Sequence, residues 1–276
     1  MAGFNGPQLT LTRRDVLTAF LAAPLVHQPI IAHCATPSFR RAILGHRFAE
    51  GDALYDVADV ISPHPEDLMP GARAFAGQAR SIMADCLGGF ADVPTSALGT
   101  PDRWGVQSAM LSPRADSDGA LAALLLARGA ARVFPTTENT ARITRLLAIE
   151  QSARQRRNGL WNLPFYRVRN ANQVDDCRDA IGSIQVLVGL VIEARLGRRR
   201  AYINFGSDYR EDVTATVPMR AVRQWAKTGF AVESLNGKTI RVRGYLEWIN
   251  GPSVSVTHPQ MIEVLSGAET VETNAG

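Results

Sequence analysis

Carboxylates and one imidazole are concentrated between residues 50 and 67, where they offer the chemistry of a metal site. Carboxylate oxygens and imidazole nitrogens bind divalent cations, and a bound cation can activate water for phosphodiester hydrolysis. The alternative is that these groups are solvated loop residues beside a proline-rich turn, Pro63 to Pro70. The groups in question are Glu50, Asp52, Asp56, Asp59, His64, Glu66 and Asp67.

Arginines form a second pattern, which indicates phosphate binding. Residues 141–170 contain seven arginines and one acid, Glu150, and further arginines cluster at a predicted hairpin near residue 198. Arginine suits bidentate phosphate contact, and aromatic side chains on strands stack with unpaired bases. The alternative is that the aromatics are core residues and the arginines ordinary surface. The candidate nucleic-acid-binding residues are Arg154, Arg156, Arg157, Arg198, Arg199, Arg200, Tyr202, Arg210, Arg241, Arg243, Tyr245 and Trp248.

The segment from Asp102 to Trp161 carries the sequence LLAIEQSARQRRNGLW near its end. This segment resembles the second half of a thermonuclease (staphylococcal-nuclease-like) domain, and the resemblance extends over about residues 50 to 161. It implies a small barrel with three helices and, in active members, calcium-dependent phosphodiester hydrolysis. That chemistry needs carboxylates for the metal, a carboxylate for the water and arginines for the phosphate charge.

The positions that match the family's catalytic motifs carry other residues in this chain. The early Asp-Gly-Asp-Thr turn has its nearest match in Glu50-Gly51-Asp52. Aligned on Pro63 and Gly105, the remaining motifs place Asp56 and Val106 at the two arginines, Ile61 at the metal aspartate and His64 at the glutamate. We therefore predict no catalytic residue by the family pattern and no resident cofactor, with calcium implied only if the family mechanism operates. Of the acids, Glu50, Asp52, Asp56 and Asp59 are the candidate metal ligands. A rearranged metal-dependent nuclease, using Asp56, Asp59, His64, Glu66 and Asp67, is the alternative.

Length and composition fit two globular domains. The chain has 276 residues, of which 46% are hydrophobic and 20% charged, with a formal net charge of +4. Thr12-Arg13-Arg14 before the apolar residues 16–32 matches a twin-arginine signal peptide, which predicts export to the periplasm or beyond. Lipidation at Cys34 and an N-terminal membrane anchor are the alternatives. No later apolar run reaches the length of a membrane span. Export would permit a disulfide between Cys86 and Cys177, and two buried free thiols are the alternative.

Periodicity predicts the elements of the first domain. Short strands are expected between residues 40 and 61, a helix over 71–87, a loop over 88–101 and a strand over 106–111. Two further helices follow, over 120–128 and 140–158. They end at Gly129 and Gly159, as helices often do, and Leu160-Trp161 packs back on the domain.

From residue 182 the pattern changes to strands, expected over 183–194, 200–205, 212–217, 238–248 and 253–257. A helix over 218–228 interrupts them, and Asn250-Gly251 predicts a tight hairpin. This order is that of an OB-fold. In the first strand, Gln185 and Glu193 are expected to point outward. The segment around Asn204-Phe205-Gly206 also resembles C-terminal extensions of bacterial thermonuclease relatives.

We therefore expect a mainly β, α+β protein with a thermonuclease-like barrel followed by an OB-like barrel. The expected divisions are a signal peptide (1–35), a thermonuclease-like domain (36–165), a linker (166–181), an OB-like domain (182–268) and a tail (269–276). The expected function is that of a catalytically degenerate module that binds single-stranded nucleic acid. An envelope protein or other envelope component is the alternative partner.

Overall fold

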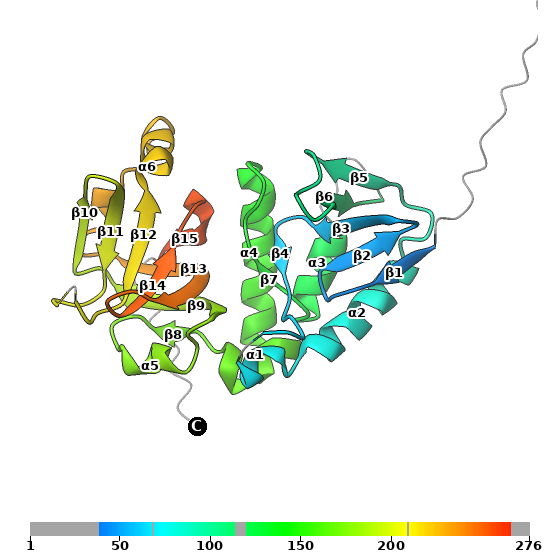
Figure 1. The fold of residues 1–276 in the computed structure, drawn as a ribbon, viewed down its shortest axis with the longest axis horizontal. Coiled ribbons are helices and arrows are strands. Elements are labelled where there is room, and N and C mark those ends of the chain that lie inside the picture. The colour runs from blue at the N-terminus through cyan, green and yellow to red at the C-terminus, as the bar shows by residue number, and fades with distance from the viewer. Residues whose placement is uncertain (1–38, 68, 114–119, 209, 266–276) are drawn as a thin grey trace, which may run out of the picture. The chain divides into compact units, whose positions relative to one another are not determined.

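The computed structural model describes residues 39–67, 69–113, 120–208 and 210–265. Residues 37–276 belong to one compact unit, and the fold is mixed α+β (Figure 1). The expected signal peptide, with Cys34, and the expected tail lie outside the described residues. Within the described segments, no helix combines the length and hydropathy that a membrane span requires.

The first sheet has the strand order β1-β2-β3-β6-β5. β1, β2 and β3 form an antiparallel meander, β6 lies parallel to β3, and β5 is antiparallel to β6. A separate two-stranded ladder pairs β4 with β7 and brings Arg132 opposite Ile61. The strands are β1 (Arg40–Ala42), β2 (Arg47–Glu50), β3 (Ala53–Val57), β4 (Val60–Ile61), β5 (Thr95–Leu98), β6 (Val106–Leu111) and β7 (Arg132–Val133).

Helices pack on this sheet through the apolar faces that the sequence predicts. α3 buries Leu121, Leu125 and Leu126, and α4 buries Ile143 and Leu146 in the same core. The single helix expected over residues 71–87 is instead two helices, because the backbone turns at residues 74–75. The turn places Phe75 in the core, 4% exposed. The helices are α1 (Pro70–Arg73), α2 (Ala76–Gly88), α3 (Ala120–Ala127) and α4 (Thr140–Gln155).

Two glycines allow the ends of α3 and α4 to meet. Gly129 and Gly159 both have positive φ, 63° and 55°. A Cβ on Gly129 would lie 2.1 Å from the Asn158 carbonyl oxygen, so no larger residue fits there. Leu160 N–H then donates to the Gly129 oxygen at 2.9 Å, and Trp161 is buried next to it. The predicted closing role of this motif is confirmed.

The segment expected as a linker, residues 166–181, contains ordered and buried elements. It forms β8 (Arg169–Asn170), parallel to β9, and α5 (Asp175–Arg178). Arg169 is fully buried, because its guanidinium reaches the Asp179 carboxylate and the Asp176 carbonyl, both at 2.5 Å. Two short 3₁₀ helices precede β8 in the chain, η1 (Gly159–Asn162) and η2 (Pro164–Tyr166). The polar composition that suggested a linker serves internal hydrogen bonds instead.

The second sheet has the order β10-β11-β12-β14-β13-β9-β8, with β15 on β13. β12 and β14 are parallel, and the predicted hairpin at Asn250-Gly251 joins β13 to β14 with both residues at positive φ. The strands are β9 (Ser183–Leu190), β10 (Glu193–Leu196), β11 (Arg200–Asn204), β12 (Thr214–Pro218), β13 (Thr239–Trp248), β14 (Pro252–Ser255) and β15 (Ile262–Val264). The helices are α6 (Met219–Ala226) and the 3₁₀ helices η3 (Val232–Leu235) and η4 (Pro259–Met261).

Three local expectations are wrong. β5 lies in the expected loop, because its pairing with β6 supplies the order that its small side chains do not predict. The strand expected over 183–194 breaks into β9 and β10 at Val191 and Ile192. Gln185 is fully buried rather than outward, and it donates to the Ser183 hydroxyl at 2.9 Å. The buried Arg169 side chain lies against it, with Nε 3.5 Å from the Gln185 Oε1, so the segment expected as a linker covers this side chain.

The two buried cysteines, Cys86 and Cys177, are free thiols. Cys86 belongs to the core under the first sheet and Cys177 to the core of the second. Burial raises the pKa of each thiol, that of Cys177 to about 12. The structure therefore agrees with two buried thiols and not with the alternative of a disulfide.

A buried ion network joins α4 to the second sheet. The Arg243 guanidinium on β13 donates to both Glu150 oxygens, at 2.7 and 3.0 Å, and to Glu263 at 2.6 Å. Glu150 also accepts the Val133 N–H at 2.7 Å. Arg243 and Glu150 are each 1% exposed. Burial lowers the pKa of Arg243, but the two carboxylates outweigh this and hold it above its ordinary value.

Removing the Glu150 charge should destabilise the protein strongly. Breaking one partner of a buried ion pair costs about 3–5 kcal/mol, because the other charge stays buried without full compensation. We expect Glu150→Gln to lower the free energy of unfolding by that amount in urea titrations. Glu138→Gln, on an exposed glutamate of the preceding loop, should change it by less than about 0.5 kcal/mol. Equal effects of the two substitutions would contradict a structural role for the network.

Candidate functional site

The four positions that the thermonuclease resemblance aligned with catalytic residues lie in different surroundings. Asp56 on β3 accepts two hydrogen bonds from Arg47 on β2, at 2.6 and 2.8 Å, so its charge is compensated across the ladder. Val106 begins β6 and is buried. Ile61 and His64 line a pocket, but isoleucine offers no metal ligand. These positions therefore hold a paired carboxylate, a buried apolar residue and two residues of a pocket.

The candidate metal ligands are held apart by their own partners. Glu50 pairs with Arg40 at 2.9 Å and accepts the Thr95 hydroxyl at 2.5 Å, whereas Asp52 is exposed in the β2–β3 turn. No group of three or more His, Cys, Asp or Glu side chains within the described parts of the chain is placed to hold a cation.

Asp59 is a buried structural centre. Its carboxylate is fully buried and accepts hydrogen bonds from the backbone N–H groups of Thr136 and Thr137, each at 2.7 Å. It also pairs with the guanidinium of Arg142, which donates in addition to the Ala58 oxygen at 3.0 Å. These bonds tie the β3–β4 turn to the start of α4. Of the rearranged site, only His64 and Asp67 share a pocket, and Glu66 N–H donates to the His64 ring at 3.1 Å within the same turn.

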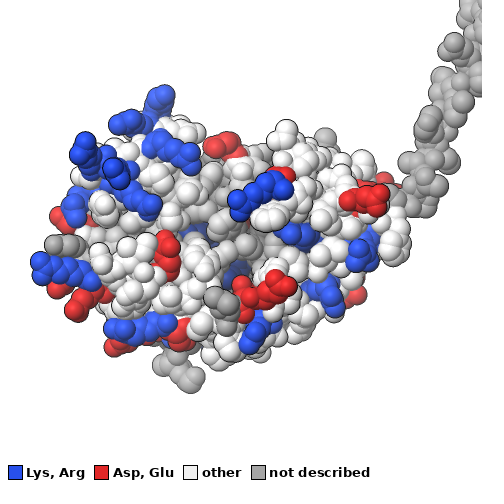
Figure 2. Space-filling model, in the orientation of Figure 1, with Lys and Arg blue, Asp and Glu red and all other residues white. Residues whose placement is uncertain are grey.

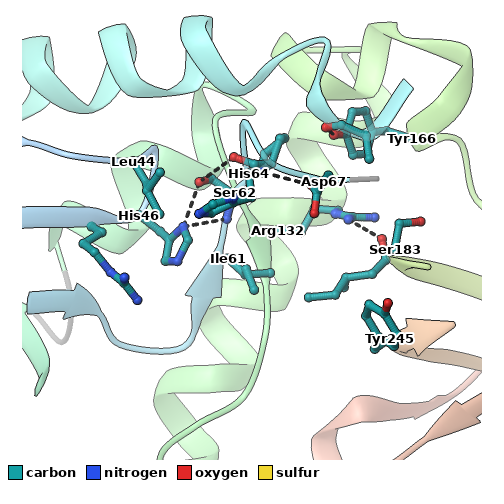
Figure 3. Close-up of a pocket in the computed structure, with 14 residues that line it drawn as sticks. Leu44, His46, Ile61, Ser62, His64, Asp67, Arg132, Tyr166, Ser183 and Tyr245 are labelled. Carbon is teal, nitrogen blue, oxygen red and sulfur yellow. Dashed lines mark hydrogen bonds between the residues drawn. The ribbon is translucent and has the colours of Figure 1, made fainter. Parts of the chain in front are cut away.

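A histidine and a serine that the sequence analysis did not select lie in this pocket (Figure 3). His46 Nδ1 lies 2.7 Å from the Ser62 Oγ and accepts the Ser62 N–H at 3.2 Å. Nδ1 is therefore an acceptor, and the neutral ring carries its hydrogen on Nε2. Burial lowers the pKa of His46 to about 4, with Asp56 opposing this and Arg47 contributing to it. The sequence has no local signal for this pair, because 16 positions separate the two residues.

The arrangement of Ser62, His46 and Asp56 differs from that of an activated nucleophile. The distance from His46 Nε2 to the Asp56 oxygen is 3.9 Å, which is too long for a hydrogen bond. A general base works best with a pKa near the working pH, and burial has moved this imidazole well below neutrality. The pair therefore satisfies buried polar groups and gives the fold a sensitivity to acid.

The arginines of α4 are distributed over different environments. Arg156 and Arg157 are exposed at the end of the helix. Arg154 is half-buried, and its guanidinium lies 5.7 Å from the centre of the Trp161 ring. Only the first two face solvent as expected, so this helix provides a small basic surface.

Arg241 and Arg243 are not on an accessible face. They are 6% and 1% exposed, and both bind Glu263, which in turn belongs to β15. Tyr245 is half exposed at the rim of the pocket in Figure 3. Trp248 is also half exposed, and its ring carries the Arg178 guanidinium at 4.9 Å. Arg241, Arg243, Tyr245 and Trp248 therefore do not form the single exposed aromatic and basic face that the sequence predicts.

A groove on the second sheet brings together the remaining candidates. It has a volume of about 470 Å³ and lies across β10, β11, β12 and β14, next to the β13–β14 turn. Arg200 and Tyr202 project from alternate positions of β11, and Arg195 places its guanidinium 4.9 Å from the centre of the Tyr202 ring. Its other lining residues are Asn204, Thr214, Thr216, Ile249, Asn250 and Ser253.

Basic side chains surround one end of this groove. Figure 2 shows Lys and Arg gathered over α6 and the neighbouring ends of β10 and β11. The Met219 N–H at the start of α6 donates to the Arg199 oxygen at 3.1 Å, which holds the two segments together. The run of arginines predicts a basic surface at the β10–β11 hairpin but not at α6, because only tertiary contact joins the two segments. The exposed residues of this basic rim are Arg195, Arg198, Arg199, Arg200, Arg220, Arg223 and Lys227.

Arg210 is exposed beyond β11, where its N–H donates to the Asp208 side chain at 3.1 Å.

Neither protein-family models nor curated proteins provide a match to this chain.

Acid should destabilise the protein through His46. The unfolded side chain takes up a proton near pH 6.5, whereas the folded one does so only near pH 4. Its contribution to stability is therefore complete above pH 6.5 and is lost as pH falls toward 4, by about 3 kcal/mol at most. We expect His46→Asn, which keeps an acceptor near the Nδ1 position, to show a smaller loss in urea titrations across this range. A loss equal to that of the unsubstituted protein would show that His46 is not responsible.

Proposed function

We propose that the protein binds single-stranded nucleic acid through the groove and basic rim of its C-terminal half. The observation that carries the proposal is their co-location: a groove with aromatic, amide and hydroxyl side chains is bordered by a cluster of exposed arginines. The N-terminal half is then a thermonuclease-like domain that keeps the frame of that family without its chemistry.

Strand order supports an OB-like architecture in both halves. In the second sheet, β10 forms one edge, and β9 lies next to the short edge strand β8 at the other end. β9 and β10 are consecutive in sequence, so adjoining segments of the chain lie near the two ends of the sheet. β9 and β10 are counted together as the first strand, followed by β11, β12, β13 and β14 as the second to fifth. The order across the sheet is then first, second, third, fifth, fourth and first, and the third and fifth strands are parallel. The first sheet has the same order over β1, β2, β3, β6 and β5, and Arg40 of β1 reaches Thr95 of β5 at 3.1 Å. OB-folds bind oligonucleotides on the face of their second and third strands, which here are β11 and β12.

The groove has the chemical groups that single strands require. The Tyr202 ring and the Arg195 guanidinium above it form a flat unit on which a base stacks. Asn204, Thr214 and Asn250 offer donors and acceptors to base edges. None of these groups demands one particular base, so we expect little sequence preference.

The rim provides the electrostatic part of binding. Arg195 and Arg200 of the rim also line the groove, and Glu193 is the neighbouring acid, paired with Arg195 at 3.3 Å. A strand lying in the groove would therefore place its phosphates against an excess of positive charge. Binding by such a surface releases counterions and weakens as salt rises.

Removing three rim charges should change both affinity and salt dependence. We expect Arg198→Gln/Arg199→Gln/Arg200→Gln to weaken the binding of a fluorescent oligonucleotide by roughly tenfold or more at low salt. The slope of log K against log salt should become less steep by about 2, because each phosphate contact of a single strand contributes about 0.7. Anisotropy titrations at several salt concentrations measure both quantities.

The matched control removes the same charge elsewhere. Arg73→Gln/Arg80→Gln/Arg128→Gln changes three exposed arginines on the helices of the N-terminal half and should leave affinity and slope unchanged. Equal losses from both triple variants would mean that net charge alone drives binding, and no binding at low salt would overturn the proposal. Metal-dependent cleavage of the oligonucleotide that His64→Ala abolishes would favour the rearranged nuclease instead.

A further inference from the structure

The pocket in Figure 3 has a volume of about 200 Å³ and lies beside the β4–β7 ladder, away from the nucleic-acid groove. Residues from β4, β7, β9 and β13 line it, so it is enclosed by segments that are distant in sequence. Neither the replaced catalytic positions nor the proposed strand-binding groove uses its most unusual member, Arg132.

Arg132 is a buried cation with unused hydrogen-bond donors. The residue is 5% exposed, and its Nη2 donates to the Ile184 oxygen. Nε and Nη1 have no hydrogen-bond partner. The guanidinium lies 5.0 Å from the centre of the Tyr166 ring. Among the ion pairs of the described residues none involves Arg132, although a buried charge is costly unless it is paired.

Other buried arginines of the described residues have a carboxylate partner, which Arg132 lacks. Arg142 has the Asp59 carboxylate, Arg169 has Asp179, and Arg243 has Glu150 and Glu263. Burial lowers the pKa of Arg132 to about 10, which still leaves it positively charged at neutral pH. The protein thus places a cation in a cavity and provides no carboxylate at ion-pair distance to neutralise it.

Other polar groups of the pocket narrow the chemistry of a ligand. Arg47 lines it, but its charge is matched by Asp56. His64 Nδ1 accepts the Glu66 N–H, so the neutral ring has Nε2–H as a free donor. The Tyr166 hydroxyl is committed to the Ala72 oxygen. Asp67 adds one carboxylate, whose Oδ2 accepts the His64 N–H at 3.0 Å.

An oxyanion would offer the Arg132 guanidinium a further acceptor, and Asp67 determines which kind of oxyanion fits. A carboxylate in the pocket repels a fully deprotonated anion, whereas an anion that carries its own hydrogen can donate to it. Phosphate keeps such a hydrogen near neutral pH and sulfate does not. The volume suffices for a group of this size but not for a whole nucleotide chain.

We propose that this pocket is a binding site for hydrogen phosphate, held by Arg132 with His64 as a further donor and with Asp67 accepting the phosphate hydrogen. The site is separate from the groove of the C-terminal half, so its ligand and the nucleic acid do not compete.

Calorimetric titration of the full chain with inorganic phosphate, and with sulfate at matched ionic strength, tests the site. We expect saturable binding of phosphate at neutral pH and a rise in Tm with phosphate concentration. Sulfate should bind roughly tenfold more weakly or worse, because it meets the Asp67 charge without a hydrogen to donate. Absence of a saturable phosphate signal, or equal affinity for both anions, would overturn the proposal.

Arg132→Met should abolish phosphate binding, whereas Arg128→Met, on an exposed arginine at the end of α3, should leave it unchanged. Without phosphate, Arg132→Met should unfold at the same urea concentration as the unsubstituted protein or a higher one, because it removes an unpaired buried charge. A purely structural arginine would instead be strongly destabilising to replace, with phosphate binding absent from the unsubstituted protein as well.

Asp67→Asn provides a test that does not depend on the folding of the Arg132 variant. Its amide oxygen keeps an acceptor for the His64 N–H, while the repulsion toward sulfate is removed. We expect the ratio of phosphate to sulfate affinity to fall roughly tenfold toward equality. An unchanged ratio would show that Asp67 does not face the anion, and would contradict the assignment of hydrogen phosphate.

Discussion

The buried guanidinium of Arg243 connects the parts of this protein. It lies on β13 and reaches Glu150 of α4 and Glu263 of β15, so a helix of the N-terminal half is bonded to two strands of the C-terminal half. Because Glu150 also accepts the Val133 N–H, the same network fixes β7 and its ladder with β4. The desolvation of these charges is costly, and pairing of Arg243 with two carboxylates offsets it. Because this pairing needs α4, β13 and β15 next to one another, the network links these elements.

This constraint also determines where ligands can bind. Arg241 and Arg243, which the sequence predicts on a nucleic-acid-binding face, form buried ion pairs instead. Asp59 likewise forms internal hydrogen bonds and an ion pair at the start of α4. One group of exposed arginines lies around α6 and the β10–β11 hairpin, where Glu193 pairs with Arg195. In the pocket beside β4, by contrast, Arg132 is buried and lacks the carboxylate that each comparable arginine has.

The elements that the sequence predicted well share a strong local pattern. α3, α4 and β13 have apolar residues at helical or strand spacing, and the Asn250-Gly251 turn has a specific backbone requirement. The elements that it missed depend on distant partners. β5 has four small or modest side chains and exists through its pairing with β6, and β8 exists through its pairing with β9. The same holds for the site: the rim was found as a run of arginines, but its union with α6 and the groove was not.

What the sequence alone determined is the alternation of elements, their mixed α+β character, and the residue types that stand at Asp56, Ile61, His64 and Val106. These follow from side-chain types and spacing, which are local properties. Only the tertiary structure decided which arginines are accessible, because the environment of a charge depends on elements far along the chain. Arg199, Arg132 and Arg243 are alike in sequence, yet one is exposed, one is buried without a carboxylate partner, and one is buried between two glutamates.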